Sequence, residues 1–292
     1  MEEQISEFLS TLQNERGYSA NTVEAYRNDL NQLLSFATNE RPHLAQWNRV
    51  DKPLLLGFLL HLRERGYSAS SISRKVAVIK TFFHFLQERS YVGDNPAATL
   101  GAPRVEKRIP QILQRDEVER LLAAPANHST PKGLRDRAIL ELLYASGMRV
   151  TELVSLDVDA MNLENNTVHC TGSGAKKRVI PIADRAADAL ADYLQRARPV
   201  FAVGADERAL FVNPHGKRLT RQGLWLIIKE YVAEARITAP VTPHTLRHSF
   251  AVHLLSHGTD LEKVQRLLGH ASAATTQFYV RMVEPSVGAT DE

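Results

Sequence analysis

Over residues 1–90, hydrophobic residues recur every three or four positions, which is the spacing of one face of an α-helix. Ile5, Phe8, Leu9 and Leu12 begin this pattern at the N-terminus. A later stretch continues it with apolar side chains that we expect in the core: Val76, Ile79, Phe82, Phe83 and Phe85. The pattern predicts a small helical domain over residues 1–90.

A short segment occurs twice within this helical region. Glu15-Arg-Gly-Tyr-Ser-Ala20 recurs as Glu64-Arg-Gly-Tyr-Ser-Ala69. In each copy the glycine suits the position after a helix end, and the serine suits the cap of the next helix. The repeat therefore predicts two helix hairpins, and so four helices.

The second copy begins a helix that carries hydroxyl groups and bases. Free backbone N–H groups at a helix start, together with such side chains, bind phosphate well. The helix is thus predicted to contact phosphate through Ser68, Ser70, Arg74, Lys75 and Lys80. The alternative is a plain four-helix bundle in which the repeated turns only separate helices.

The helical pattern stops over residues 91–111, where glycine and proline residues interrupt a polar stretch. We interpret this stretch as an interdomain linker, and it adds the bases Arg104, Lys107 and Arg108 to the predicted phosphate contacts. Residues 61–108 hold nine Lys or Arg against four Asp or Glu, a local excess of five positive charges. Such an excess favours a polyanionic partner.

Residues 112–292 form a second predicted domain, which is mainly α-helical with one small β-sheet. Leu134–Tyr144 is expected to be a largely buried helix, and Ser146-Gly147 a turn after it. Thr167–Cys170 and Arg178–Ile182 are predicted to pair as strands, with Ala209–Val212 as a third strand.

The C-terminal part of this domain gathers side chains with complementary chemistry. Thr242 and Pro243 predict a helix start, from which His244 and Arg247 project on one face. Gly269 ends the following helix, so that His270 is held at a turn, and a last short helix carries Tyr279. Arginine binds phosphate oxygens, histidine transfers protons near neutral pH, and tyrosine can attack phosphorus.

Composition limits the remaining classes of protein. The formal net charge is +3, and the single cysteine, Cys170, allows no intrachain disulfide. The N-terminus lacks the pattern of a signal peptide, and no apolar run is long enough to span a bilayer, so we expect a soluble cytoplasmic protein.

His244, His248, His253 and His257 do not share one face, and there is no HExxH motif, so no metal is predicted. No phosphate-binding Gly-x-x-x-x-Gly-Lys loop calls for a nucleotide cofactor.

The spacing of these residues resembles a known family. His244-x-x-Arg247, Leu268-Gly269-His270 and Tyr279 are similar to the C-terminal signature of the tyrosine recombinase (phage integrase) family, above all the bacterial XerC/XerD type. The further arginine that this family places about a hundred residues upstream corresponds to Arg149. It lies in Gly147-Met-Arg149-Val-Thr-Glu152, where Glu152 is its expected ion-pair partner.

The resemblance implies a fold and a reaction. It implies a SAM-like core-binding domain that contacts DNA, joined to a tyrosine recombinase catalytic domain. Tyr279 would attack a phosphodiester to form a 3′-phosphotyrosyl link, with Arg149, Arg247 and His270 on the phosphate and His244 as the general base. His248 would either contact the phosphate itself or support the residues that contact it.

Two features depart from the family pattern. The family usually has Gly-Lys-Gly in the loop between the paired strands, where lysine protonates the leaving hydroxyl, but this chain has Gly172-Ser173-Gly174. Lys176 is the candidate acid in its place, with Lys177 as the neighbouring candidate. A native variant, an engineered weakening and a shifted loop all explain Ser173. The tail after Tyr279 has only 13 residues, including Pro285 and Gly288, whereas the family commonly ends in a helix that docks on a neighbouring subunit.

By the same resemblance, the partners would be a duplex recombination site and a homo- or hetero-tetramer formed on it with a second recombinase. The biological role would be resolution of chromosome or plasmid dimers, with a membrane-anchored cell-division activator as a further partner. Two other classes stay open: a type IB topoisomerase-like enzyme that reseals the same strand, and a DNA-binding protein with a disabled site, for which Ser173 is the argument.

Overall fold

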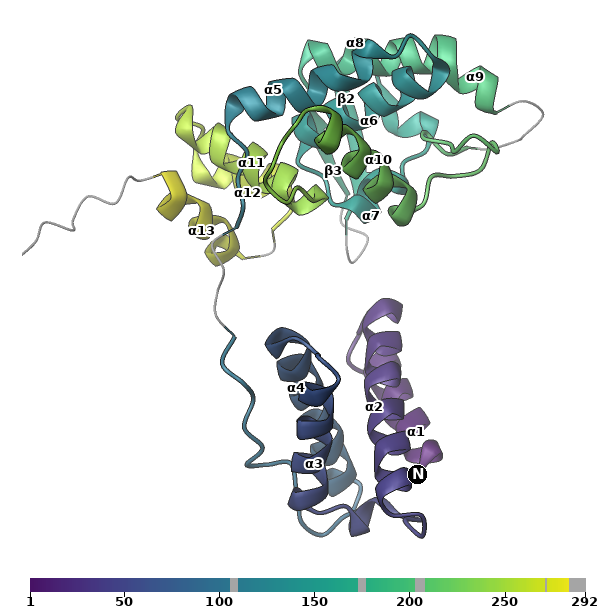
Figure 1. The fold of residues 1–292 in the computed structure, drawn as a ribbon, viewed down its shortest axis with the longest axis vertical. Helices are drawn as coiled ribbons and strands as arrows, with labels where there is room; N and C mark the ends of the chain where they lie inside the picture. The colour runs from purple at the N-terminus through teal and green to yellow at the C-terminus, as the bar shows by residue number, and fades with distance from the viewer. Residues whose placement is uncertain (106–109, 173–176, 203–207, 271, 284–292) are drawn as a thin grey trace, which may run out of the picture. The chain divides into compact units, whose positions relative to one another are not determined.

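The fold is seen in a computed structural model, which describes residues 1–105, 110–172, 177–202, 208–270 and 272–283. The chain divides into two compact units, residues 1–108 and 109–292. Each unit has its own hydrophobic core. Figure 1 traces their helices and strands in chain order.

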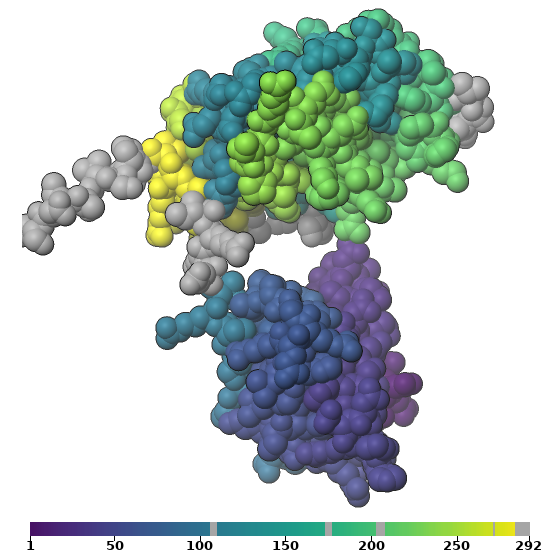
Figure 2. All heavy atoms as spheres, in the orientation of Figure 1, coloured from purple at the N-terminus to yellow at the C-terminus, as the bar shows by residue number. Residues whose placement is uncertain are grey.

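The N-terminal unit consists of four helices, as the sequence predicts. They are α1 (Glu2–Asn14), α2 (Ala20–Glu40), α3 (Lys52–Glu64) and α4 (Ala69–Glu88), with a short 3₁₀ turn at Trp47–Arg49. The five residues of α4 expected in the core are all buried, as are the four apolar residues that begin α1. In the space-filling view of Figure 2 the atoms of these helices, coloured purple to blue, form one compact body.

The repeated segment forms the two helix boundaries expected of it. Gly17 and Gly66 have φ angles of +66° and +76°, a left-handed backbone that suits glycine. Ser19 accepts a hydrogen bond from the backbone N–H of Thr22, and Ser68 accepts one from that of Ser71. The same local chemistry therefore ends one helix and starts the next in both hairpins.

The N-terminal unit continues beyond residue 90 into the predicted linker. Val92, Ala97 and Leu100 are buried in the same core as the four helices. The backbone between them turns, with Asn95 accepting a hydrogen bond from the N–H of Ala97. The sequence did not predict this burial. Glycine and proline interrupt the helical spacing here, yet the apolar residues between them still pack into the core.

In the C-terminal unit, α6 (Pro131–Ser146) lies at the centre of the core. Ile139, Leu140, Leu142 and Leu143 are fully buried, because α5, α8 and α11 pack against this helix. The other helices are α5 (Arg115–Ala123), α7 (Val150–Val154), α8 (Asp184–Asp192), α9 (Arg198–Phe201), α10 (Arg221–Glu234), α11 (Pro243–Ser256), α12 (Leu261–Leu268) and α13 (Ala273–Val283). A π-helical turn, Tyr193–Ala197, joins α8 to α9.

The sheet has three antiparallel strands in the order β1-β2-β3: Met161–Asn162, Thr167–Thr171 and Lys177–Pro181. The hairpin of β2 and β3 was predicted, and Cys170 lies opposite Arg178 in it. The mainly helical fold with one small sheet is thus confirmed.

The prediction of Ala209–Val212 as the third strand is wrong. This run forms only isolated bridges, and the short β1 takes the edge position beside β2. All four of its residues are buried among helices, and the hydroxyl of Tyr193 donates a hydrogen bond to the carbonyl of Leu210. A short apolar run buried on all sides has the same sequence pattern as a buried strand.

Within the described residues, we find no helix that has both the length and the hydropathy needed to cross a membrane.

Candidate active site

The start of α11 presents the first two predicted site residues. Thr242 caps the helix by accepting a hydrogen bond from the N–H of Thr245, and Pro243 occupies its first turn. His244 is exposed at this start, whereas Arg247, one turn further on, has only 4% of its surface exposed. The helix therefore separates an accessible imidazole from a buried guanidinium.

Arg247 joins three segments through its guanidinium group. It donates hydrogen bonds to the carbonyl oxygens of Gly147 and Leu268, the latter at 2.7 Å, and its Nη2 lies 3.0 Å from Nε2 of His270. Burial, together with the nearby charge of Arg149, lowers its pKa to about 10, so that it stays cationic at neutral pH. A guanidinium held by fixed carbonyl groups has the preorganised charge that stabilises anions in active sites.

Gly147 and Arg149 form the turn between α6 and α7. Gly147 has a φ angle of +57°, and a Cβ atom there would lie 2.4 Å from the ring of Phe250. Arg149 follows at the cap of α7, with 37% of its side chain exposed. Its guanidinium donates to Glu152 at 3.1 Å, and its backbone N–H donates to the same carboxylate at 2.8 Å. The predicted pairing of Arg149 with Glu152 is confirmed.

A second arginine, Arg178 of β3, also binds Glu152. Its Nη1 and Nη2 donate to the two carboxylate oxygens at 2.9 and 2.8 Å, and its Nε donates to the carbonyl of Leu267 at 2.9 Å. Although burial alone would raise the pKa of Glu152, hydrogen bonds from Arg178 and from the backbone of Arg149 lower it to about 2. The sequence did not identify Arg178, because a base at a strand start is ordinarily exposed.

His270 lies at the turn after α12, as predicted. Gly269 ends the helix in the left-handed conformation, with a φ angle of +66°. The Nδ1 atom of His270 lies 2.9 Å from the hydroxyl of Thr276, and its Nε2 faces Arg247. Burial and the charges of the nearby arginines lower its pKa to about 4, so the ring is neutral at pH 7.

Tyr279 lies on α13 against α11, and only 3% of its surface is exposed. Its hydroxyl is 2.8 Å from Nδ1 of His248, and its ring stacks near that of His270 with centroids 6.3 Å apart. Burial raises the pKa of Tyr279, although the charges of Arg247 and Arg149 oppose this effect. Tyr279 thus lies close to the arginines, but its hydroxyl is paired and covered.

The imidazole in contact with Tyr279 differs from the one predicted. His244 was expected beside the tyrosine, whereas the structure brings His248 there, and the rings of the two histidines are 6.3 Å apart. The reason is helical geometry, since His248 lies one turn further into the protein on the same face of α11. Burial and the neighbouring His244 and Arg247 lower the pKa of His248 to about 4.

The remaining histidines of α11 have other partners. The Nδ1 atom of His253 lies 2.8 Å from the hydroxyl of Tyr144, and His257 contacts the guanidinium of Arg115. Among the residues that the structure describes, no three His, Cys, Asp or Glu side chains gather as a metal site would require. Ser173 and the candidate acid Lys176 lie outside the described residues, whereas Lys177 is described and exposed at the start of β3.

The predicted phosphate contacts of the N-terminal unit differ in how exposed their side chains are. Ser68, Ser70 and Arg104 are exposed, and Lys80 is half-buried. Lys107 and Arg108 lie outside the described residues.

Lys75 and Arg74 bind a carboxylate of their own unit instead. The ammonium group of Lys75 lies 2.6 Å from Asp29 and 2.7 Å from the amide oxygen of Gln32, and 3% of the side chain is exposed. This burial is evidence against the prediction that Lys75 contacts phosphate, because its hydrogen bonds are used inside the protein. Arg74 also binds Asp29 but keeps 48% of its side chain exposed, so it retains access to a ligand.

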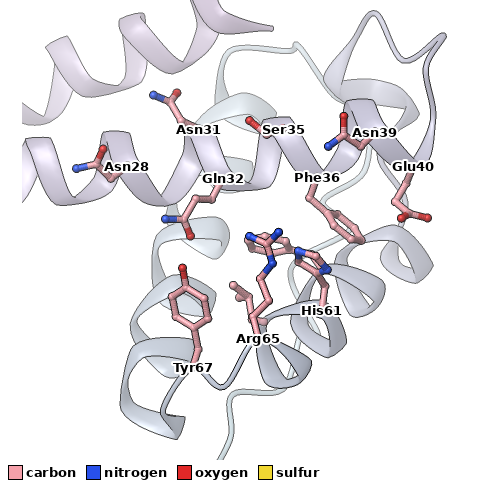
Figure 3. Close-up of a pocket in the computed structure, with 12 residues that line it drawn as sticks. Asn28, Asn31, Gln32, Ser35, Phe36, Asn39, Glu40, His61, Arg65 and Tyr67 are labelled. Atoms are coloured by element: carbon pink, nitrogen blue, oxygen red, sulfur yellow. The ribbon is translucent and has the colours of Figure 1, made fainter.

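A pocket of about 450 Å³ lies beside this cluster, between α2 and the end of α3. Figure 3 shows Gln32, Arg65 and Tyr67 directed into it, below a row of polar residues on α2. Gln32 forms part of the pocket wall and accepts the hydrogen bond from Lys75. The pocket thus borders the buried Lys75, and the residues that line it include none of the predicted phosphate contacts.

Comparison with known families agrees with this architecture. The phage integrase family profile matches residues 111–284, and the profile of the phage integrase N-terminal SAM-like domain matches residues 5–90. The first match alone covers more than half of the chain. The chain therefore belongs to the phage integrase family, as its motifs predicted.

Individual relatives identify the class of enzyme. The chain is 46% identical to tyrosine recombinase XerC of Herpetosiphon aurantiacus, over 97% of this chain and 91% of that protein. It is 41% identical to tyrosine recombinase XerD of Oceanobacillus iheyensis, over 97% and 95% of the two chains. The fold is also similar to that of XerH site-specific recombinase in a post-cleavage complex with its difH substrate, with a TM-score of 0.76, 22% identity and coverage of 96% and 82%. The protein is a tyrosine recombinase that acts in site-specific recombination, and the topoisomerase and disabled-binder alternatives are not favoured.

Proposed function

We propose that this chain cuts and rejoins DNA with Tyr279 as its nucleophile. The observation that carries the proposal is the convergence of the Tyr279 hydroxyl, the neutral imidazoles of His248 and His270, and the cations Arg149 and Arg247 in one site. In the reaction, the Tyr279 oxygen bonds to phosphorus and the bond to the 5′ oxygen breaks. The products are a 3′-phosphotyrosyl link and a 5′ hydroxyl that carries the proton from a general acid.

The two arginines suit different parts of phosphate binding. Arg247 is buried and held by backbone carbonyls, so its position changes little when a ligand arrives. Arg149 is more exposed and meets the incoming phosphodiester first. Together they bind the nonbridging oxygens and stabilise the charge that grows on them in the pentacoordinate transition state. His270 adds a hydrogen bond to the same phosphate.

The contact between His248 and Tyr279 represents a resting arrangement in this proposal. A base with a pKa of about 4 is too weak to take a proton from a tyrosine whose pKa is raised above its ordinary value. Engagement of DNA brings a negative phosphate to the start of α11, where the exposed His244 becomes the base toward Tyr279. The reaction therefore requires the Tyr279 hydroxyl to leave His248 and turn toward the phosphate.

The proton donor for the leaving 5′ oxygen is a lysine near the β2–β3 hairpin. Lys176 is our first candidate and Lys177 the second, since the serine at position 173 cannot act as a cationic acid. The bond energy of the phosphodiester is kept in the phosphotyrosyl link, so rejoining needs no nucleotide cofactor.

We assign DNA contacts to hydroxyl and basic side chains at the start of α4 and along it, and to the bases of residues 91–111. Side chains of this kind, together with helix starts, position a duplex by its phosphates. The proposed contacts are Ser68, Ser70, Arg74, Lys80, Arg104, Lys107 and Arg108.

Exchange between two duplexes breaks and joins four strands, and each cleavage uses one Tyr279. We therefore propose a tetramer on DNA, formed with identical subunits or with a second recombinase. Similarity to XerC and XerD supports a cytoplasmic role in resolving chromosome or plasmid dimers. Such a role would take a membrane-anchored cell-division protein as activator.

A suicide substrate tests the proposal. A labelled recombination-site duplex carries a nick beside the scissile phosphate, so that cleavage releases a short fragment and the covalent adduct accumulates. A DNA-binding protein with a disabled site would shift the duplex in a native gel without forming an adduct. A topoisomerase-like enzyme would form the adduct and relax supercoiled plasmid, yet would yield no recombinant product from a two-site plasmid.

A further inference from the structure

Arg178 connects three segments, and two of them hold residues of the active site. It extends from β3, binds both oxygens of Glu152 on α7, and donates its third hydrogen bond to the carbonyl of Leu267 on α12. Its side chain is 14% exposed, and that of Glu152 is 4% exposed. These bonds use all three nitrogens of the planar guanidinium, a geometry that a lysine could not reproduce.

The residues held in this way stand next to groups that would touch the substrate. Glu152 binds the guanidinium and the backbone N–H of Arg149. Leu267 precedes Leu268, whose carbonyl accepts the hydrogen bond from Arg247, and His270 lies two residues beyond. Arg178 is thus linked to Arg149 through Glu152, and it binds the backbone carbonyl next to the one that Arg247 binds.

Gly269 is fitted to this arrangement. A Cβ atom at position 269 would lie 3.0 Å from Nη1 of Arg178 and 3.2 Å from its Cζ. The left-handed φ angle of +66° at the same residue also disfavours any side chain there. The end of α12 is therefore shaped to let the guanidinium approach the backbone closely.

A buried carboxylate between two arginines is in itself an ordinary structural feature. Glu141 provides a comparison in the same unit, since it is equally buried and binds Arg185 at 2.5 Å, while Arg185 also binds Glu119. No predicted site residue is bonded to either of these carboxylates in the described part of the chain. Arg178 differs because its carboxylate partner is bonded to Arg149.

We propose that Arg178 is a positioning residue for DNA cleavage, which acts by fixing the guanidinium of Arg149 and the end of α12 relative to the scissile phosphate. This inference rests on the proposed function. A displacement of about 1 Å in such a group lowers the rate by about 100-fold. Removal of Arg178 is therefore expected to slow the chemical step more than it weakens DNA binding.

The test compares Arg178→Gln and Arg178→Lys with Arg149→Ala and with the control Arg185→Gln. For each full-length variant we would measure the dissociation constant for the suicide duplex, the single-turnover rate of adduct formation and the thermal unfolding midpoint. Arg178→Gln is expected to lose about 100-fold in cleavage rate. Arg178→Lys is expected to restore little of it, because the ammonium group cannot form all three bonds. If Arg178→Gln does not fold, Arg178→Lys carries the same comparison.

A substrate with one nonbridging oxygen of the scissile phosphate replaced by methyl separates positioning from general destabilisation. This methylphosphonate has two stereoisomers, and one of them lacks the oxygen that Arg149 binds. On that isomer Arg149→Ala should cleave at nearly the wild-type rate. The Arg178 variants should recover the part of their loss that acts through Arg149, while the full defect remains on the other isomer.

An equal loss on the phosphate and on both isomers would overturn the inference, as would a loss no greater than that of Arg185→Gln. A wild-type chain that forms no adduct on the ordinary phosphate would instead contradict the proposed function itself. Failure of the inference and failure of the function therefore give different results in one set of measurements.

Discussion

The hydroxyl of Tyr279 lies 2.8 Å from Nδ1 of His248, and the tyrosine is 3% exposed. The proposed nucleophile is therefore stored against an imidazole that is too weak a base to activate it. In the proposed mechanism, binding of DNA exchanges this partner for the phosphate and for His244. The two histidines, one helical turn apart, would then have separable roles.

Substitution of the two histidines distinguishes these roles. His244→Gln should lower the single-turnover cleavage rate by about 100-fold or more, because general base catalysis contributes that much. His248→Asn should cleave faster than His244→Gln, since the wild-type bond to His248 must break before attack. Cleavage of the suicide substrate, with binding measured separately, checks both. A slower reaction in His248→Asn than in His244→Gln would assign the base to His248.

The two arginines should differ in their effect on folding. Arg247→Ala leaves the carbonyls of Gly147 and Leu268 without their donor, and each buried unpaired group costs about 1–3 kcal/mol. Arg149→Ala should cost less, because Glu152 keeps both hydrogen bonds from Arg178. Both variants should fail to cleave. Urea unfolding provides the measurement, and equal losses of stability would contradict the structural role given to Arg247.

Restoring the family lysine should accelerate the reaction. Ser173→Lys supplies a cationic acid at the family position. Because Lys176 already donates the proton in our proposal, the gain should be smaller than the factor of about 100 or more that a general acid contributes. A substrate with a 5′-bridging sulfur needs no such acid, because a thiolate is a much better leaving group than an alkoxide. On that substrate the wild type and Ser173→Lys should react at similar rates. A rate advantage that persists with sulfur would exclude leaving-group protonation as its cause.

Substitution of Lys75 should lower the stability of the N-terminal unit, whereas substitution of Lys80 should weaken DNA binding. Lys75→Met leaves Asp29 with Arg74 as a partner but removes its hydrogen bond from Lys75 and that of Gln32, so it should destabilise the N-terminal unit by about 1–3 kcal/mol. Lys80→Ala should leave stability nearly unchanged, weaken DNA binding and lower the salt dependence of the binding constant. Unfolding curves and binding titrations at several salt concentrations measure both. If Lys75→Met folds normally and its DNA-binding constant depends less on salt than that of the wild type, Lys75 does contact DNA.

The sequence predicted those parts of the fold that depend on local chemistry. The repeated glycine and serine residues set helix ends and caps, and Thr242 did the same for α11, because such positions depend on backbone conformation alone. The buried run Ala209–Val212 was wrongly assigned to a strand, because residues distant in the sequence determine what packs around it.

The predicted catalytic residues that the structure describes lie near one another, but their pairing could not be read from spacing. His244 and His248 share a helix face, and only the packing of α13 decides which of them meets Tyr279. Lys75 looked like a surface base because its partner, Asp29, lies on another helix. Arg178 was missed for the same reason, since its role depends on α7 and α12 meeting at β3.

The most direct test of the account is mass spectrometry of the covalent adduct formed with the nicked recombination-site duplex, beside Tyr279→Phe. The account predicts a single peptide with nucleotide linked to Tyr279, and no adduct in Tyr279→Phe although that variant still binds the duplex. An adduct at another residue, or one that persists in Tyr279→Phe, would contradict the assignment of Tyr279 as the nucleophile.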